Sequence, residues 1–435
     1  MLRICPRLLL ASHSLIGLAI SLTAADLASG ENWPQWRGPE SNGVASPGAY
    51  PVTFDAETGL AWKVVLPGVG ASTPAVWGDR IFLTAGVQGA DTVCAYDFTG
   101  AKLWQKSLGP ERPARNRNAS GSNPSPVTDG EHVVVYFKSG ALACLDPSGE
   151  IKWQKNLQDL YGKDTLWWDL ATSPVIVGDR AVVAVMHAGE SFLVAFNLSD
   201  GAEAWKQPRQ YQRPDESDQA YTTPQVAQID GRPAIITFGA DHLTAHEAET
   251  GKLLWDLDGF NPTDERMWRV IASPAISGGI AFIPYGRGEH LAAIRVDQPQ
   301  PARLWERAER ELGADVPTPV VDGDKAYLLT DEGNIQCLDL ATGNELWSHE
   351  LRRSRNNFFA SPVLAGDHLY CVREDGVMFV VHVGAEPKLV ATNAMGEKVI
   401  ASPVPVRNGL LIRGEEHLFW IHGASSSPAA ESAAP

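Results

Sequence analysis

The sequence predicts an all-β protein: an eight-bladed β-propeller of four-stranded antiparallel blades, closed by an N-terminal strand that completes the last blade. Three observations predict this fold. A Ser/Thr-Pro dipeptide recurs eight times along the chain, a Gly followed by a Trp recurs near the end of most copies, and glycine and proline are abundant, with 40 and 30 residues. Repeats of roughly 20–50 residues are typical of propellers and solenoids, and frequent Gly and Pro favour short strands joined by tight turns.

The first 25 residues have the layout of a secretory signal peptide. Arg3 and Arg7 precede an apolar run at 8–22, and the small residues at 23–25 offer a cleavage site. No later apolar run approaches the roughly 20 residues that a membrane helix needs. The sequence therefore predicts a periplasmic or secreted protein without a transmembrane segment.

Composition divides the remaining chain into three parts. We expect a linker at residues 26–54, the propeller at 55–423 and a disordered tail at 424–435. The tail consists mostly of Ala, Ser and Pro without an apolar pattern, so it cannot bury enough surface to fold.

The Ser/Thr-Pro dipeptide marks the start of each blade. Each copy precedes a short apolar strand, and the spacing between copies runs from 52 residues down to 41. The eight copies begin at Thr73, Ser125, Ser173, Thr223, Ser273, Thr318, Ser361 and Ser402. A repeat of this length accommodates four short strands, which is one propeller blade.

The sixth copy shows the unit most clearly. Strands are predicted at 319–321, 326–330, 335–338 and 345–351. They are separated by 322–324, 331–333 and 341–343, each of which contains a Gly beside residues that tolerate positive φ. Copy eight stops near Trp420 and lacks a fourth strand, so the segment 58–63 is predicted to supply it and close the ring. Closure removes the unpaired strand edges that favour aggregation.

A tryptophan on the predicted fourth strand is expected to dock between neighbouring blades. Copy seven departs from the pattern, with Leu389 in a segment that lacks a Trp. The predicted docking residues are Trp62, Trp104, Trp153, Trp205, Trp255, Trp305 and Trp347.

These repeats resemble the pyrroloquinoline-quinone (PQQ) repeat family, whose docking motif reads Ala-x-Asp-x-x-Thr-Gly-x-x-x-Trp. The segments 245–255 and 339–347 match well, and 97–104, 146–153 and 195–205 are shorter or looser versions. The run Trp33-Pro-Gln-Trp-Arg-Gly-Pro39 also looks like the opening segment of exported bacterial members. The resemblance covers roughly residues 33–422 and implies the propeller fold.

The family resemblance implies two different functions. Quinoprotein dehydrogenases hold PQQ and Ca²⁺ at the propeller axis, commonly against an adjacent Cys-Cys pair, whereas BamB-like propellers bind partner proteins without a catalytic site. No two cysteines are neighbours in this sequence, and no residue matches a catalytic or calcium-binding motif. A lipidated cysteine after the signal, which BamB-like lipoproteins carry, is also missing, because Cys5 precedes the apolar run.

Charge and cysteine usage exclude other classes of function. A net charge of −16 argues against binding DNA or RNA through a broad basic surface. Cys94, Cys144, Cys337 and Cys371 all lie in strand-like runs without CxxC spacing, so we expect small buried hydrophobes and no metal site. A Gly-rich phosphate loop, an HExxH motif and a nucleophile elbow are also missing from the sequence.

The loops that connect one blade to the next are expected to converge on the mouth of the central channel. In an acidic chain they are rich in arginine and tryptophan, which suit carboxylates, phosphates or sugars through bidentate bonds and stacking. The alternative is that these arginines are solvated charges paired with nearby Asp and Glu. The candidate residues are Arg112, Arg115, Arg117, Trp167, Trp168, Asp169, Arg266, Trp268, Arg269, Arg352, Arg353 and Arg355.

The sequence favours a non-catalytic, monomeric scaffold that binds another envelope or secreted protein and needs no cofactor. One alternative is a PQQ- and Ca²⁺-dependent dehydrogenase of alcohols or sugars. A second is a propeller that binds a glycan or a small anionic ligand at its mouth.

Overall fold

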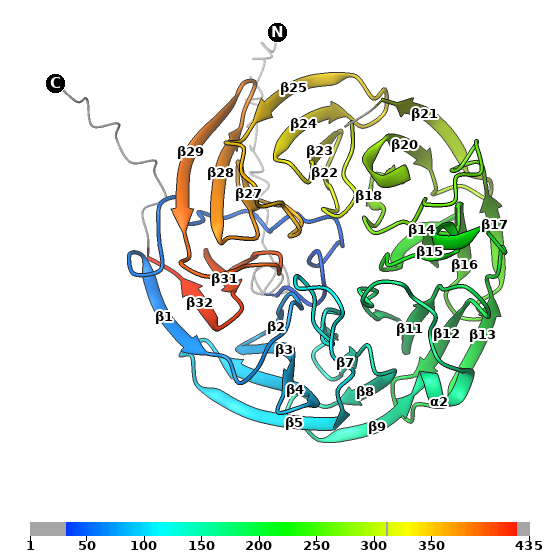
Figure 1. Ribbon diagram of the computed structural model, residues 1–435, viewed down its shortest axis with the longest axis horizontal. Coiled ribbons are helices and arrows are strands. Elements are labelled where there is room, and N and C mark those ends of the chain that lie inside the picture. The colour runs from blue at the N-terminus through cyan, green and yellow to red at the C-terminus, as the bar shows by residue number, and fades with distance from the viewer. Residues whose placement is uncertain (1–31, 310–311, 424–435) are drawn as a thin grey trace, which may run out of the picture.

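The computed structural model describes residues 32–309 and 312–423, which form eight four-stranded antiparallel sheets arranged in a ring (Figure 1). The predicted eight-bladed propeller is therefore confirmed. The signal-like segment 1–25, the first residues of the linker and the tail 424–435 lie outside the described residues. Among the described residues, no helix combines the length and apolar character needed to span a bilayer.

The blades follow one another around the ring in chain order, and the first strand of each is the innermost. Blades 1 and 2 are β2 (Ala75–Trp77), β3 (Arg80–Val87), β4 (Ala90–Asp97), β5 (Lys102–Pro110) and β6 (Val127–Thr128), β7 (Val133–Tyr136), β8 (Ala141–Leu145), β9 (Ile151–Asn156). Blades 3 and 4 are β10 (Val175–Val177), β11 (Arg180–Val185), β12 (Phe192–Asn197), β13 (Glu203–Pro208) and β14 (Gln225–Ile229), β15 (Arg232–Gly239), β16 (His242–Glu247), β17 (Leu253–Leu257).

The second half of the ring repeats this arrangement. Blades 5 and 6 are β18 (Ala275–Ser277), β19 (Ile280–Tyr285), β20 (His290–Arg295), β21 (Ala302–Ala308) and β22 (Val320–Asp322), β23 (Lys325–Leu329), β24 (Asn334–Asp339), β25 (Glu345–Glu350). Blades 7 and 8 are β26 (Val363–Ala365), β27 (His368–Val372), β28 (Val377–Val383), β29 (Pro387–Ala394) and β30 (Val404–Val406), β31 (Gly409–Arg413), β32 (His417–Ile421), β1 (Leu60–Val65). The described helices are short: α2 (Leu157–Tyr161) and the 3₁₀ turns η1 (Asp215–Asp218) and η2 (Gly286–Gly288).

Burial follows the position of a strand within its blade. The second strand of blade 5, β19, is buried along its whole length because its two faces pack on the neighbouring blades. The outermost strand β21 instead alternates between exposed and half-buried residues, as expected for an edge with one face toward solvent. The four cysteines in the described chain are free and buried, as predicted.

The ring is closed at its circumference by the N-terminal strand. β1 pairs antiparallel with β32, so that Trp62 lies opposite Trp420 and Val64 opposite Leu418. Figure 1 shows β1, in blue, beside β32, in red. The prediction that this segment completes the eighth blade is confirmed.

Tryptophan and glycine of successive repeats meet across the blade boundaries. Trp305 of blade 5 packs on Gly343 of blade 6, and its Nε1 donates to the Leu340 carbonyl at 2.9 Å. Gly343 has a φ of +72°, and a Cβ there would lie 2.6 Å from the indole, so both its conformation and its neighbour require glycine. The same indole-to-carbonyl bond forms at Trp62, Trp104, Trp153 and Trp205. Trp255 is also buried, but its Nε1 has no hydrogen-bond partner among the described residues.

The Ser/Thr-Pro dipeptides form a closed circle of hydrogen bonds around the axis, which we call the axial ring. The backbone N–H of each Ser or Thr donates to the hydroxyl oxygen of its counterpart in the next blade, at 2.9–3.3 Å. The eighth bond, from Ser402 to Thr73, closes the circle. Because the following proline has no N–H, the next backbone nitrogen needs no partner at this crowded position.

Residues 33–54, expected as a linker outside the ring, pack across one face of it, and we call them the N-terminal segment. Its backbone exchanges hydrogen bonds with the innermost strands of several blades, at Val76, Thr128, Val321 and Leu364. In Figure 1 this segment, in dark blue, crosses the middle of the ring. It therefore closes one end of the central channel.

A buried arginine anchors the N-terminal segment. The Arg37 side chain is 1% exposed, and its guanidinium donates to the carbonyls of Pro362 at 2.5 Å and Pro319 at 2.7 Å. Burial lowers the pKa of Arg37 to about 9. The two carbonyls belong to blades 6 and 7, at the prolines of the axial ring, so one side chain joins the segment to two blades.

Replacing a docking tryptophan should destabilise the ring. We expect Trp153→Ala, which removes a buried indole and its bond to the Leu198 carbonyl, to lower the free energy of unfolding by about 3–5 kcal/mol. Urea denaturation followed by circular dichroism measures this change. Leu346→Ala, on an exposed side chain of β25, is the control and should cost less than about 0.5 kcal/mol. Equal losses in the two variants would contradict the docking role.

Replacing Arg37 should loosen the N-terminal segment. We expect Arg37→Met to cost about 1–3 kcal/mol, because the carbonyls of Pro319 and Pro362 lose their donor while the volume is largely kept. Thermal unfolding measures the loss, and limited proteolysis near residues 33–54 should become faster. The matched control is Arg232→Met, on an exposed turn. An unchanged melting temperature for Arg37→Met would count against the anchor.

Candidate functional site

The loops between the fourth strand of one blade and the first strand of the next surround the end of the channel opposite the N-terminal segment. They carry all the candidate arginines and tryptophans, and several of their residues line the axial cavity together with Trp36 of the N-terminal segment. We call this end of the channel the mouth. The structure divides the candidate residues into two buried networks and an exposed rim.

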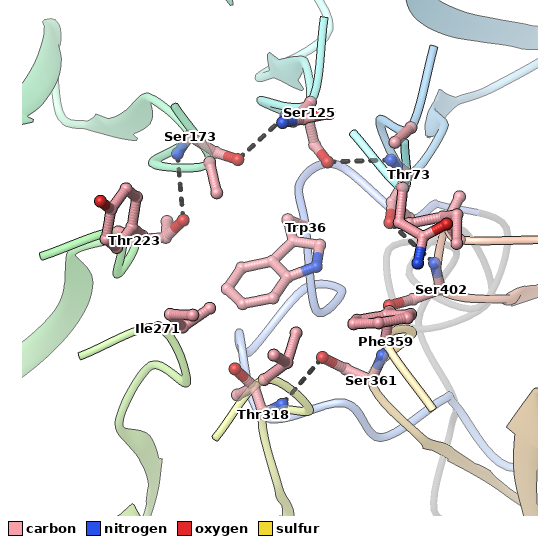
Figure 2. Close-up of a pocket in the computed structure, with 18 residues that line it drawn as sticks. Trp36, Thr73, Ser125, Ser173, Thr223, Ile271, Thr318, Phe359, Ser361 and Ser402 are labelled. Carbon is pink, nitrogen blue, oxygen red and sulfur yellow. Dashed lines mark hydrogen bonds between the residues drawn. The ribbon is translucent and has the colours of Figure 1, made fainter. Parts of the chain in front are cut away.

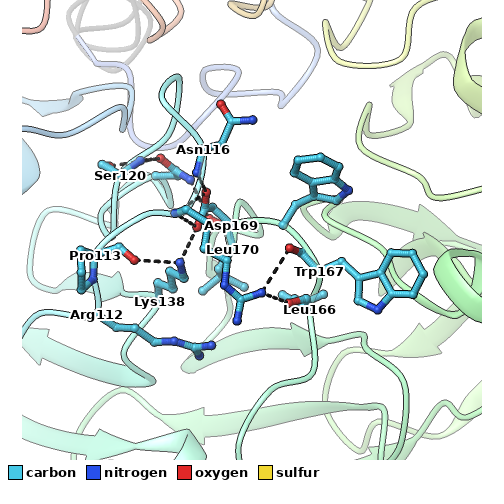
Figure 3. A network of polar contacts seen from close by, with 12 residues as sticks. Arg112, Pro113, Asn116, Ser120, Lys138, Leu166, Trp167, Asp169 and Leu170 are labelled. Carbon is cyan, nitrogen blue, oxygen red and sulfur yellow. Dashed lines mark hydrogen bonds and ion pairs between the residues drawn. The ribbon is translucent and has the colours of Figure 1, made fainter.

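The first network joins the loop after blade 1 to the loop after blade 2 (Figure 3). The buried Asp169 carboxylate accepts the backbone N–H groups of Arg115 and Asn116 at 2.9 Å and the ammonium of Lys138. Lys138 is itself only 3% exposed and donates to the Pro113 carbonyl at 2.9 Å. Asp169 thus fixes the fold of the neighbouring loop and is not presented to a ligand.

The same two loops position an exposed tryptophan. The Arg115 guanidinium donates to the carbonyls of Leu166 and Trp167 at 3.0 and 3.2 Å, and Arg112 pairs with Asp164. The Trp167 backbone N–H donates to Gln219 Oε1 at 2.7 Å, while its side chain stays 46% exposed. Three loops therefore hold Trp167 in place with its indole toward solvent.

The second network surrounds a fully buried carboxylate, Glu216. It accepts a hydrogen bond from Trp168 Nε1 at 2.6 Å and pairs with Arg269 at 3.1 Å and Arg287 at 3.5 Å. The Arg269 guanidinium also pairs with Asp315 at 2.6 Å and lies 5.6 Å from the centre of the Trp168 ring. Arg269 is therefore neutralised by two acids from the loops on either side of its own.

A further carboxylate continues this network into blade 6. Asp331 accepts the backbone N–H groups of Asp315 and Val316 at 2.7 and 3.2 Å. Burial and the adjacent Asp315 charge raise the pKa of Asp331 to about 7, and burial also raises the pKa of Asp315. These two acids, Arg269 and Arg287 line a cavity of about 500 Å³ beside the mouth.

One candidate aromatic residue is not where the sequence suggested. Trp268 was expected to present an aromatic face at the mouth, but it is only 8% exposed and its Nε1 donates to the Phe260 carbonyl at 2.7 Å. It packs in the core between blades 4 and 5, where an indole of this size is buried without cost once its N–H is bonded. Its neighbour Arg266 is exposed and pairs with Asp215 at 2.5 Å.

The remaining arginines form the rim of the mouth. Arg353 pairs with Glu350 at 2.6 Å, at an exposed position. Arg117, Arg352 and Arg355 are exposed and make no ion pair with another described residue. The expectation of solvated arginines paired with nearby acids thus holds for only part of the set. The candidate residues with exposed side chains on this face, together with Met267, are Arg115, Arg117, Trp167, Trp168, Arg266, Arg352, Arg353 and Arg355.

A small cavity of about 180 Å³ lies on the axis between the mouth and the N-terminal segment (Figure 2). Trp36 forms its floor, seven of the eight residues of the axial ring form its wall, and Asn118, Tyr221 and Phe359 lie toward the mouth. A second cavity of about 210 Å³, which includes Trp168 and Arg269, shares four lining residues with it and continues toward solvent. The channel is thus open at the mouth and closed by Trp36.

The axial cavity does not fit the quinone cofactor of the dehydrogenase alternative. PQQ is a tricarboxylate that is held with Ca²⁺, and both charges need oppositely charged side chains in a buried site. No charged residue lines the axial cavity. Among the described residues, one set of metal-competent side chains lies within reach of a shared ion, namely Glu397, Glu416 and His417, and none of the three lines the axial cavity.

Sequence reasoning missed several residues that build the site. The residues missed lie in other loops than the groups they contact, so no local spacing reveals the contacts. Glu216 and Asp315 pair with Arg269, Lys138 pairs with Asp169, and Asp331 accepts the backbone N–H of Asp315. The available signal was a charged residue directly after an apolar strand, as in Phe137-Lys138. Such a residue must find a partner if the strand end is buried.

Comparison with known proteins identifies relatives of the whole propeller. The family described as outer membrane protein assembly factor BamB matches residues 43–218, 187–348 and 260–386. The chain is similar to outer membrane protein assembly factor BamB of Yersinia pestis, at 26% identity over 72% of this chain and 75% of that protein. The BamB of Salmonella typhimurium is also 26% identical, over 75% of this chain and 79% of that protein.

Solved structures share the fold at lower identity. BamB from Moraxella catarrhalis superposes with a TM-score of 0.58 at 15% identity, over 83% of this chain and 99% of that one. A europium-containing methanol dehydrogenase gives a TM-score of 0.66 at 12% identity, over 89% of this chain and 88% of that one. These likenesses show a common propeller architecture, whereas the family match extends over most of the described chain. The chain belongs to the PQQ-like β-propeller family described as outer membrane protein assembly factor BamB.

Proposed function

We propose that this chain is a protein-binding scaffold of the cell envelope that takes part in outer-membrane protein assembly, and that it binds its partner through the rim of the mouth. The observation that carries the proposal is the exposed Trp167, which three loops hold in place on a face where Arg117, Arg352 and Arg355 are exposed without an ion pair to another described residue. The names of the relatives supply the assembly role, and the signal-like segment 1–25 supports export.

The chemistry of the rim defines the partner. Trp and Arg are enriched in the residues that contribute most to protein–protein binding, because they bury a large surface and form directed polar bonds. Arg117, Arg352 and Arg355 place positive charge on a chain whose net charge is −16. The partner should therefore present an apolar side chain flanked by carboxylates, and opposite charges should speed association at low ionic strength.

Pre-organisation of the rim also supports a binding role. The loops that carry Trp167 and Trp168 are tied by buried charges, Asp169 with Lys138 and Glu216 with Arg269. A side chain held in its bound orientation loses less conformational entropy on association than a mobile one. Buried ion networks of this kind add little to stability, so their presence under two exposed tryptophans fits a positioning role.

Removal of the rim tryptophan should weaken partner binding. A photo-crosslinking residue placed at the exposed Met267 position, applied to envelope extracts and read by mass spectrometry, identifies the partner, and we expect a component of outer-membrane protein assembly. With that partner purified, Trp167→Ala should cost about 2 kcal/mol, a roughly 30-fold rise in Kd, and Arg355→Glu should slow association.

The matched control for this experiment is Arg232→Glu. Arg232 is the exposed first residue of β15, away from the loops of the mouth. Arg232→Glu therefore makes the same charge change as Arg355→Glu at a position outside the rim. It should leave the Kd within a factor of two. Equal binding by Trp167→Ala and the unmodified chain, or an equal loss in Arg232→Glu, would refute the rim as the docking surface.

A further inference from the structure

We infer that the axial cavity is a binding site for one neutral pyranose sugar, either free or at the end of a glycan, with Trp36 as its stacking platform. The cavity lies on the axis below the protein-docking rim, and the inference does not rest on the proposed function. It follows from the shape of the cavity, the chemistry of its wall and the exposed face of its floor.

The floor of the cavity is an aromatic platform that comes from outside the blades. Trp36 belongs to the N-terminal segment and is half-buried. Figure 2 shows its indole at the centre of the circle of labelled residues, with one face of the ring toward the viewer. Its Nε1–H makes no hydrogen bond to another described residue. Arg37, the next residue, is locked to two blades, so the platform is fixed.

The wall of the cavity offers a circle of hydroxyl groups. Each hydroxyl oxygen of the axial ring accepts one backbone N–H, and none of these groups donates to another described residue. Because a hydroxyl carries one donor and two acceptor lone pairs, each retains its O–H and one lone pair. Asn118 also lines the cavity, and its Oδ1 accepts no hydrogen bond from another described residue, whereas its Nδ2 donates to Glu374 at 2.7 Å.

This combination matches the surface of a pyranose. A pyranose has an apolar face of C–H groups that packs on an aromatic ring and a circumference of hydroxyl groups that both donate and accept hydrogen bonds. A hydrocarbon of the same size would leave the hydroxyls of the wall without partners, at a free-energy cost. A charged ligand is disfavoured because no charged residue lines the cavity.

The size of the cavity restricts the ligand to one sugar. About 180 Å³ is room for roughly six water molecules and falls below the ~300 Å³ at which pockets for drug-sized ligands begin. The adjoining cavity of about 210 Å³ gives a glycan chain a way out past Trp168, a residue that is 42% exposed. A free sugar and the terminal residue of a glycan therefore share this chemistry, and binding measurements distinguish them.

The test is isothermal titration calorimetry of the purified chain with D-glucose, D-galactose and N-acetyl-D-glucosamine, and with cellotriose and chitotriose. At least one neutral monosaccharide or trisaccharide should bind with a Kd of about 1 mM or below. A trisaccharide at least tenfold tighter than its monosaccharide identifies the end of a glycan, and equal affinities identify a free sugar. The charged pyranoses D-glucuronate and D-glucosamine should bind at least tenfold more weakly than the best neutral sugar.

Two variants assign the binding to the axial cavity. Trp36→Ala removes the platform, and Ala171→Phe fills the cavity while leaving Trp36 in place, so each should weaken binding at least tenfold. Ala101→Phe, at an exposed turn of blade 1, is the matched control and should bind as the unmodified chain does. Circular dichroism verifies that every variant is folded.

Three results would overturn the inference: no binding by any neutral sugar, binding of D-glucuronate as tight as that of the best neutral sugar, or undiminished binding in folded Ala171→Phe. None of these results would bear on the protein-docking rim, because the titrations contain no partner protein.

Discussion

The fold depends on the closed circle of hydrogen bonds at the axis. Each blade contributes one Ser or Thr whose N–H and hydroxyl bond to the neighbours on either side, and the eighth bond returns to Thr73. Each bond contributes only about 1 kcal/mol, but together they fix the distance of every innermost strand from the axis. The width of the channel follows from this circle, and so does the size of the cavity above Trp36.

The ring is closed at its axis, at its circumference and at one face, so the channel opens only at the mouth. β1 completes the outer pairing of blade 8, and the N-terminal segment, anchored by Arg37, covers one end of the channel. The loops of the mouth are the long connections that remain, and they are tied by two buried ion networks. Under the proposed function, the surface left for a partner protein is the rim, with the exposed Trp167 and Trp168 and the exposed arginines of the mouth loops.

The fold could be predicted because the same local signals recur in every copy. The Ser/Thr-Pro dipeptide and the turn residues are local signals, each recognisable within about ten residues of sequence. The missing fourth strand of copy eight indicated that β1 closes the ring. The site could not be read in this way, because its contacts join residues about 30 to 70 positions apart, such as Lys138 with Asp169 and Arg287 with Glu216. Trp268 shows the same limit, since its burial depends on how its loop folds back onto Phe260. The role of Trp36 and Arg37 could not be predicted either, because no local pattern in the linker indicates that it crosses the axis.

The account is tested most directly by native-state hydrogen exchange of the eight amides of the axial ring. If the circle holds the blades together, these amides should exchange only through global unfolding, with one common free energy of opening that equals the unfolding free energy of the chain. The amides of the mouth loops should exchange faster, through local opening. Axial amides that exchange at clearly different rates from blade to blade, at free energies below global unfolding, would contradict the account.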